Sequence, residues 1–146
     1  NFAKKIMKLI SERKEIKVIC DQIASPTTTR SLSIAIWETI KKNETYSSQN
    51  KVFPNIGHFC NAGIASWYDI ALAIREIGLE TGLINNPGNI IPIQSKDYPS
   101  IAERPKYSVL DTRETYEVLN TKYFYWRDDL HNEFKKIKNF KSKNNH

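Results

Sequence analysis

Three polar side chains that follow an apolar run near the start of the sequence offer groups that could bind a ligand. Gln22, Ser25 and Thr27 carry amide and hydroxyl groups, which both donate and accept hydrogen bonds. They stand just before an expected helix, and the free N–H groups of a helix N-terminus bind anions. The arrangement suits a phosphate or a sugar hydroxyl. The same residues fit a turn followed by a helix N-cap equally well, so both interpretations stay open.

Arg104 is the second candidate for ligand binding. It stands between Glu103 and Pro105 in a long segment without helical or strand periodicity. Its planar guanidinium could hold a diphosphate through two parallel hydrogen bonds. An ion pair with a carboxylate is the alternative. Trp67 and Trp126, in contrast, are interpreted as core anchors and not as stacking platforms for a base.

The sequence lacks the residue patterns of a self-contained catalyst. None of the five glycines forms the G-x-G-x-x-G turn with which dinucleotide-binding folds approach a pyrophosphate. No tyrosine is followed four residues later by the lysine that lets a phenol act as general acid in short-chain dehydrogenases. Cys20 and Cys60 have no partner at metal-ligand spacing and are interpreted as reduced structural thiols. We therefore assign no catalytic residue and no metal site to this chain.

The formal net charge of +6 is concentrated at the C-terminal end. Five lysines lie within residues 135–146, which hold no acid, and this leaves a charge of only +1 on residues 1–134. We expect residues 1–134 to form one globular region and residues 135–146 to form a basic flexible tail, without a nucleic-acid partner. The sequence holds neither an apolar run long enough to cross a membrane nor a signal peptide, which indicates a cytoplasmic protein without a membrane partner.

The elements that must position the candidate residues alternate between helices and short strands, which is typical of an α/β unit with few strands. The chain opens at Asn1 with helical periodicity and no initiator Met, so we expect it to be a piece of a longer protein. Helices are expected over 2–13, from Leu32 to Ile40, from Ser66 to Gly78 or Gly82, over 111–119 and from 126 onward; strands over 16–20, 57–61 and 90–93; and loops over 43–55 and 94–108.

Four blocks of the sequence stand in a specific order and spacing: NFAK at 1–4 with DQIASPT at 21–27, SWYD at 66–69, the segment from Tyr98-Pro99 through AERP at 102–105 to SVLD at 108–111, and Trp126-Arg127. Together they resemble the C-terminal part of the dTDP-4-dehydrorhamnose reductases, a family of extended short-chain dehydrogenases. The resemblance implies that residues 1–134 are the substrate-binding region of a Rossmann-type α/β enzyme whose Rossmann half is absent here. It also implies a dTDP-sugar substrate, and NADPH or NADH as a cofactor bound by the missing half.

The resemblance carries further expectations about reaction and partners. The implied reaction converts dTDP-4-dehydro-6-deoxy-L-mannose to dTDP-L-rhamnose, a step of dTDP-rhamnose and polysaccharide biosynthesis, and the 146-residue segment alone is predicted to be inactive. Asn1 would follow the substrate loop of the Rossmann half and face the pocket. The implied partners are that half and a second copy in a homodimer. Some members dimerise around a magnesium ion, but Arg30 stands where an acidic ligand can sit, which argues against that metal interface.

A second function is compatible with the same resemblance. The regulatory subunit of methionine adenosyltransferase is similar to this family, so a non-catalytic binding subunit is the alternative to a reductase. The residues that would decide between the two belong to the missing half, where a reductase needs a Tyr-x-x-x-Lys pair.

Overall fold

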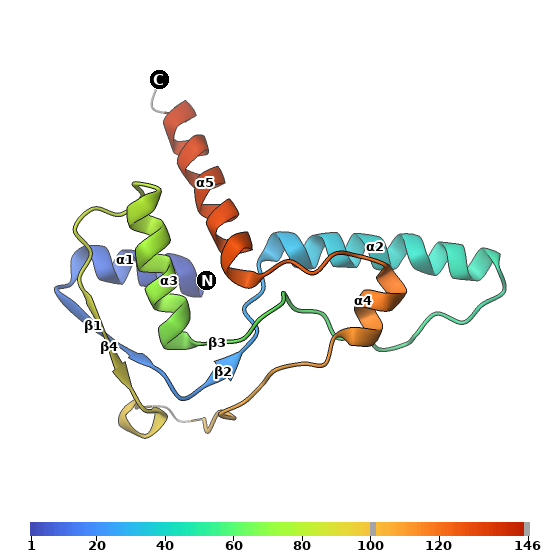
Figure 1. The fold of residues 1–146 in the computed structure, drawn as a ribbon, viewed down its shortest axis with the longest axis horizontal. Coiled ribbons are helices and arrows are strands. Elements are labelled where there is room, and N and C mark those ends of the chain that lie inside the picture. The colour runs from blue at the N-terminus through green and yellow to red at the C-terminus, as the bar shows by residue number, and fades with distance from the viewer. Residues whose placement is uncertain (100–101, 145–146) are drawn as a thin grey trace.

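The computed structural model describes residues 1–99 and 102–144 and shows an α/β arrangement with mostly helices and few strands (Figure 1). The expected helices at 2–13, from 66, at 111–119 and from 126 are confirmed, as are the strands at 16–20 and 90–93, with boundaries shifted by at most two residues. The elements are α1 (Phe2–Glu12), β1 (Glu15–Ile19), β2 (Ile23–Ala24), α2 (Thr29–Ser48), β3 (Ala65–Ser66), α3 (Trp67–Glu80), β4 (Asn89–Ile93), the 3-10 helix η1 (Ser95–Asp97), α4 (Arg113–Leu119) and α5 (Trp126–Asn144).

The core forms around a two-stranded parallel sheet of β1 and β4, in which Ile16 lies opposite Ile90. Ile16, Val18 and Ile90 are buried and pack in one cluster with Ile6 and Ile10 of α1 and with the apolar side of α3. Because side chains alternate between the two faces of a strand, a shift by one residue would expose these apolar groups. Burial against α1 and α3 therefore fixes the register of the sheet.

Helix α3 has the strongest local signals in the chain. The Ser66 hydroxyl accepts a hydrogen bond from Asp69 N at 3.1 Å, and the Asp69 carboxylate accepts one from Ser66 N at 2.8 Å, which forms the expected capping box. Ile74 in its centre is fully buried. The helix ends two residues before Gly82, which has a φ of +68°, so Gly82 follows the helix end while Gly78 lies inside the helix.

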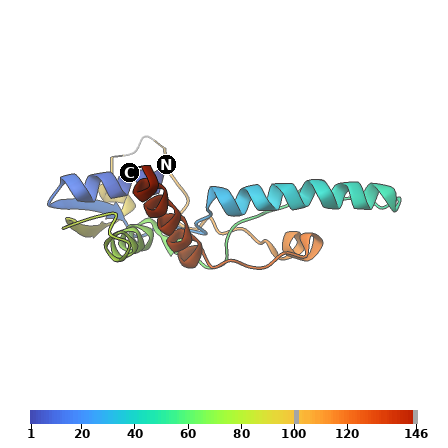
Figure 2. The same ribbon diagram turned by 90° about the horizontal axis from the view of Figure 1, so that it is seen from above.

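Helices α2 and α4, with the chain that directly follows α2, project from the core as an arm (Figure 2). α2 begins after Thr28, whose side-chain oxygen accepts a hydrogen bond from Ser31 N at 3.1 Å. It continues to Ser48, so the prediction of a loop over 43–55 is wrong for residues 43–48. These residues are polar because this part of the helix is largely exposed, and an exposed helix needs no apolar stripe.

The predicted strand over 57–61 is also wrong, since these residues have no strand structure. The nearest pairing is a single bridge between Ala62 and Tyr125. Side chains hold the segment instead, because the Tyr116 hydroxyl donates to Cys60 O at 2.9 Å and Asn61 is 1% exposed. A short apolar run does not reveal whether a strand partner exists.

Helix α5 leaves the core and extends into solvent at its C-terminal end (Figure 1). Phe134 anchors its first half in the core, at 2% exposure. Residues 135–144, expected as a separate basic tail, continue this helix, while 145–146 lie outside the described residues. The flexibility of this segment stays a prediction. Within the described residues, no helix is long and apolar enough to cross a membrane.

Candidate functional site: a cationic cleft beside β1

An open cleft of about 1280 Å³ lies beside β1. Its walls come from α1, from residues 17–22, from Trp67 at the start of α3 and from the segment after β4. That segment, 94–108, was expected to be irregular; it contains η1, and its residues 100–101 lie outside the described part of the chain. The cleft therefore opens where the carboxyl ends of two parallel strands meet, which is where ligands bind in α/β sheets.

Gln22 is held rigidly in the cleft wall by a chain of hydrogen bonds. Its side chain is buried, with Trp67 Nε1 donating to Gln22 Oε1 at 3.2 Å and Gln22 Nε2 donating to Ser95 Oγ at 2.9 Å. The Ser95 hydroxyl in turn donates to Asp21 Oδ1 at 2.7 Å, and Ser95 N donates to the same oxygen at 2.8 Å. This series of hydrogen bonds joins the end of β1 to the segment after β4 and fixes the Gln22 side-chain amide in one orientation.

The charge of Asp21 is stabilised by these contacts. The hydrogen bond from the Ser95 hydroxyl is the main reason that the pKa of the Asp21 carboxyl lies below its usual value. Asp21 therefore stays ionised and orients the Ser95 hydroxyl, whose oxygen remains available to Gln22 Nε2.

Basic side chains outnumber acidic ones in the cleft, five to two. Arg104 is exposed and forms no ion pair with another described residue, so the alternative of a paired Arg104 is not observed here. The surplus of positive charge suits an anionic ligand such as a phosphate or diphosphate. The basic residues are Lys5, Lys17, Lys96, Arg104 and Lys106, and the acidic ones are Asp21 and Glu103.

The other predicted site residues lie outside the cleft lining and have structural contacts. The Thr27 hydroxyl donates to Ser25 O at 3.3 Å and accepts a hydrogen bond from Asn61 N at 3.2 Å. Thr28 caps α2, so the turn-and-cap alternative describes this segment. Asn1 is exposed and caps α1, accepting a hydrogen bond from Lys4 N at 3.0 Å. Contact of Asn1, Ser25 or Thr27 with substrate stays a prediction.

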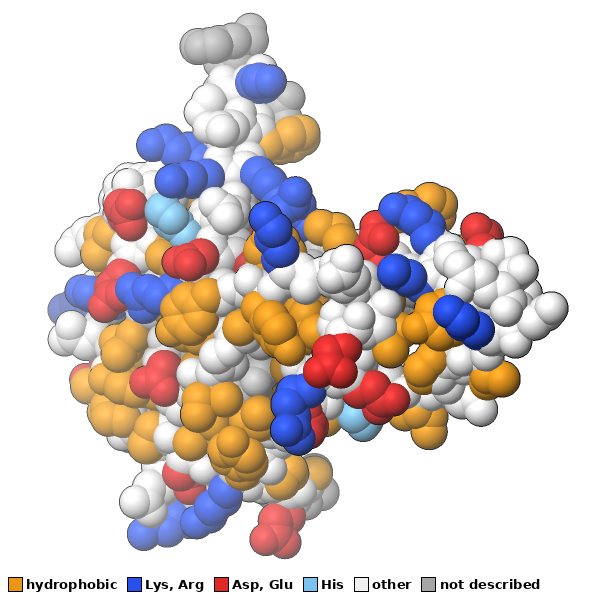
Figure 3. All heavy atoms as spheres, turned by 45° about the vertical axis from the view of Figure 1, so that its right-hand side comes forward, with side chains coloured by type: hydrophobic (Ala, Val, Ile, Leu, Met, Phe, Trp, Pro, Cys, Tyr) orange, Lys and Arg blue, Asp and Glu red, His pale blue; other side chains and the backbone are white. Residues whose placement is uncertain are grey.

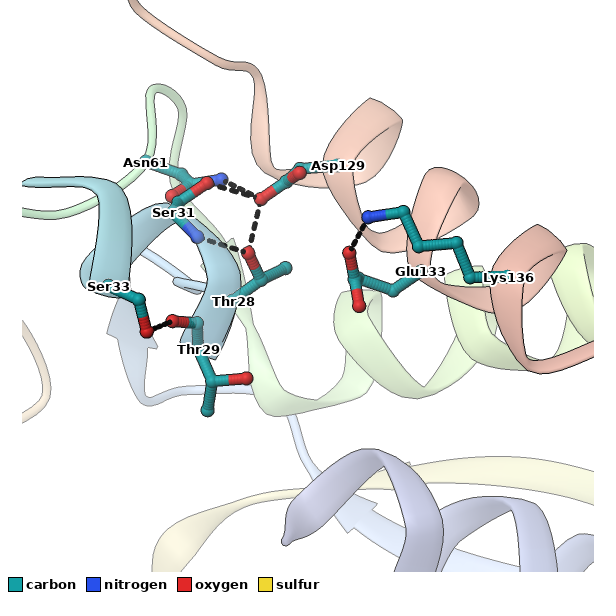
Figure 4. A network of polar contacts seen from close by, with 8 residues as sticks. All are labelled: Thr28, Thr29, Ser31, Ser33, Asn61, Asp129, Glu133 and Lys136. Carbon is teal, nitrogen blue, oxygen red and sulfur yellow. Dashed lines mark hydrogen bonds and ion pairs between the residues drawn. The ribbon is translucent and has the colours of Figure 1, made fainter. Parts of the chain in front are cut away.

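A buried carboxylate fixes the segment that carries Ser25 and Thr27. Asp129 of α5 accepts hydrogen bonds at Oδ2 from the Thr28 hydroxyl, from Ser31 Oγ at 2.6 Å and from Asn61 Nδ2 at 2.8 Å (Figure 4). Burial alone would raise the pKa of Asp129, but these three donors outweigh it and lower the pKa below its usual value. One charged group thus joins α5, the start of α2 and the Asn61 loop.

Sequence reasoning missed Asp21, Ser95 and the four lysines of the cleft. Asp21 and Gln22 could have been recognised as a pair, because two adjacent polar residues stand close to the carboxyl end of an expected strand. The lysines carry no such signal, since isolated lysines occur throughout the sequence. Among the described residues no group of His, Cys, Asp or Glu could hold a metal ion.

Comparisons with known proteins agree with this architecture. Residues 1–139 match the RmlD substrate binding domain. The chain is 34% identical over 131 residues to the spore coat polysaccharide biosynthesis protein SpsK of Bacillus subtilis, covering 89% of this chain and 40% of SpsK. It is 32% identical over 135 residues to the dTDP-4-dehydrorhamnose reductase of Aggregatibacter actinomycetemcomitans, covering 90% of this chain and 44% of that protein.

Solved structures show the same relationship. A crystal structure of a dTDP-4-dehydrorhamnose reductase from Clostridium acetobutylicum superposes with a TM-score of 0.71 at 29% identity, over 90% of this chain and 42% of that one. The reductase from Bacillus anthracis, solved in complex with NADP, superposes with a TM-score of 0.68 at 26% identity, over 90% of this chain and 42% of that one. The chain thus spans about two fifths of the length of these relatives, and it belongs to the RmlD substrate-binding domain family.

Proposed function

We propose that this chain is the sugar-nucleotide-binding part of an NAD(P)H-dependent dTDP-4-dehydrorhamnose reductase, which reduces dTDP-4-dehydro-6-deoxy-L-mannose to dTDP-L-rhamnose for polysaccharide biosynthesis. The observation that carries the proposal is the cleft at the ends of β1 and β4, which combines a rigid amide, Gln22, with surplus positive charge. The family match and the names of the relatives support a reductase over a non-catalytic subunit.

Within this function the chain's own residues bind and orient the substrate. Arg104 and Lys106 are exposed and basic, and we assign them to the diphosphate of a dTDP-sugar. Gln22 is buried and oriented, and we assign it to a sugar hydroxyl. An amide held at both ends discriminates between hydroxyl positions better than a mobile one, because its donor and acceptor cannot exchange places.

The described residues do not fit the cofactor. NAD(P)H binding in a Rossmann fold needs a glycine turn at a helix N-terminus, whereas α1, α2 and α3 begin after Asn1, Thr28 and Ser66. We therefore assign the cofactor and the proton donor to the remaining part of a protein of the relatives' length. The NADP complex of the Bacillus anthracis relative supports a nicotinamide cofactor for the whole enzyme.

The sheet suggests where that remaining part attaches. Asn89 N points toward β1 and donates to Lys14 O at 2.8 Å. Backbone N–H groups point alternately to the two sides of a strand, so the nitrogen of Pro92, three residues later, points away from β1 to the outer edge of β4. Proline has no N–H to donate, which weakens that edge for strand pairing. The outer edge of β1 contains no proline and has no partner strand among the described residues. We infer that a strand of the Rossmann half pairs with β1.

A turnover assay tests the proposed function. The protein, expressed from its complete gene, is incubated with the 4-keto sugar nucleotide and with NADPH or NADH, and dTDP-L-rhamnose is measured by mass spectrometry. A reductase forms one dTDP-L-rhamnose for each reduced cofactor consumed. Binding of the dTDP-sugar without turnover would favour the non-catalytic alternative, and a lack of binding would contradict both functions.

A further inference from the structure

Part of the lining of the cleft beside β1 is apolar. Phe2 and Trp67 contact each other in this part, with ring centroids 4.7 Å apart and ring planes tilted by 53°. Ile6 and Leu9 follow Phe2 by four and seven residues, so they lie on the same side of α1, and both also line the cleft. We call the four side chains of Phe2, Ile6, Leu9 and Trp67 the apolar corner.

Trp67 joins the apolar corner to the polar part of the cleft. Its indole Nε1 donates to Gln22 Oε1 at 3.2 Å, while its ring contacts Phe2. The single hydrogen-bonding group of the indole is therefore already used by Gln22. Phe2, Ile6 and Leu9 have no polar side-chain atom. A ligand group that enters the apolar corner thus meets side chains that offer it no further hydrogen bond.

Exposed apolar side chains do not by themselves mark a binding site. Figure 3 shows them on the arm as well as on the rest of the molecule, among charged side chains, as is common on protein surfaces. The apolar corner differs because it lines a cleft of about 1280 Å³ and adjoins an amide that is held in one orientation. Sites for small molecules typically combine an apolar lining with a few fixed polar groups.

We propose that the apolar corner binds the methyl group of the 6-deoxy sugar, and that Phe2 determines the selectivity for 6-deoxy over 6-hydroxy sugars. This inference rests on the proposed function, in which Gln22 binds a sugar hydroxyl. The methyl group is the one apolar substituent of the ring in dTDP-4-dehydro-6-deoxy-L-mannose, since the other ring carbons carry hydroxyls, the carbonyl oxygen or the diphosphate. A sugar held at Gln22 can turn only this substituent toward the adjoining apolar corner without leaving a polar group unpaired.

A sugar with a hydroxyl on carbon 6 is expected to bind more weakly. That hydroxyl is hydrogen-bonded to water in solution, and the apolar corner offers it no replacement. Hydrophobic sites distinguish ligands that differ by one small group by about 10- to 200-fold. The expected discrimination against the 6-hydroxy analogue is therefore about 10- to 100-fold.

Isothermal titration calorimetry with three sugar nucleotides tests this assignment on the protein expressed from its complete gene. dTDP-L-rhamnose is expected to bind about 10- to 100-fold more tightly than dTDP-L-mannose, which has a hydroxyl on carbon 6. In Phe2→Ala this ratio should fall to about threefold or less, whereas Phe2→Leu, which keeps a large apolar side chain, should retain most of it. Phe140→Ala, which removes a 69% exposed phenylalanine outside the cleft lining, should leave the ratio unchanged.

The third ligand, dUDP-L-rhamnose, separates the methyl group of the sugar from that of thymine. It lacks only the thymine methyl group, so its affinity relative to dTDP-L-rhamnose should be the same in the original protein and in Phe2→Ala. A change in this ratio, with the ratio of rhamnose to mannose unchanged, would place the base at the apolar corner and overturn the proposal. Equal binding of dTDP-L-rhamnose and dTDP-L-mannose by the original protein would also overturn it.

The comparison of ratios distinguishes selectivity from damage to the fold. Phe2 packs against the hydrophobic core, so thermal unfolding is recorded for each variant. Damage to the fold weakens the binding of both sugar nucleotides equally and keeps their ratio, and an unchanged ratio in Phe2→Ala would contradict the role of Phe2. If none of the three ligands bound to the original protein, the proposed function itself would be contradicted, and the methyl site with it.

Discussion

Gln22 and Arg104 line the same cleft, and the fold holds them very differently. Gln22 is 9% exposed and fixed by Trp67 on one side and Ser95 on the other. Arg104 is exposed, and its guanidinium can rotate to meet a ligand. We therefore expect Gln22 to determine the orientation of the sugar and Arg104 to supply affinity for the phosphates.

Arg104→Ala in the complete protein should raise the dissociation constant for dTDP-L-rhamnose about 10- to 100-fold, because a hydrogen bond to a charged group contributes roughly 1.5–3 kcal/mol. Isothermal titration calorimetry measures the change. Arg13→Ala, which removes an exposed arginine that does not line the cleft, is the matched control and should leave affinity intact. Equal affinities for the two variants would contradict the role of Arg104.

Asp129→Asn should lower the free energy of unfolding by about 1–3 kcal/mol, because the amide leaves donors of the buried network poorly satisfied. The pKa of Asp129 is lower in the folded state than in the unfolded state. The ionised carboxylate therefore stabilises the fold above about pH 4, and this stabilisation is lost as pH falls through the folded-state pKa. Denaturant unfolding across acidic pH should therefore show a flatter profile for Asp129→Asn. Asp128→Asn, an exposed neighbour, should behave like the original protein.

Among the helices and strands, those with both an apolar stripe and a local start signal could be predicted from sequence. α3 has its capping box and buried isoleucines, and α1 and β1 have clear periodicities. The polar second half of α2 gave no such signal, because an exposed helix on the arm needs no apolar stripe.

The cleft could be predicted only in part. Gln22 and Arg104 are local candidates, but their meeting depends on the pairing of β1 with β4.

Gly88 controls how closely the two strands of the core can approach. A Cβ built on Gly88 would lie 2.0 Å from Arg13 O, a backbone atom that cannot turn away. Gly88→Ala should therefore cost about 3 kcal/mol of unfolding free energy or prevent folding. Gly57→Ala is the control, since its Cβ would meet only the Thr115 side chain, at 3.1 Å, and should cost less than about 1 kcal/mol. Equal losses of stability in the two variants would contradict this explanation.

At the scale of the whole molecule, binding and chemistry are expected to lie in different parts of the protein. The described residues contain a cleft with a surplus of basic side chains, but no glycine turn at the start of α1, α2 or α3 that could hold a dinucleotide. The relatives are more than twice as long as this chain. The cleft is lined by residues of β1, the strand to which we assign the contact with the Rossmann half.

The 146-residue chain by itself should not oxidise NADPH in the presence of the 4-keto sugar nucleotide, because its sequence contains neither a G-x-G-x-x-G turn nor a Tyr-x-x-x-Lys pair. The decrease in NADPH absorbance is the measurement, and the complete protein is the positive control. Turnover by the chain alone would show that the division into two parts is wrong.

The three tryptophans of this chain occupy three distinct environments, so intrinsic tryptophan fluorescence can report on the cleft. Trp37 faces solvent, Trp126 is buried, and Trp67 lines the cleft and donates its indole N–H to Gln22. A ligand that displaces or strengthens this hydrogen bond changes the emission of Trp67 alone. In a Trp37→Phe/Trp126→Phe background, the fluorescence of the remaining indole would report occupation of the cleft in real time, without a labelled nucleotide.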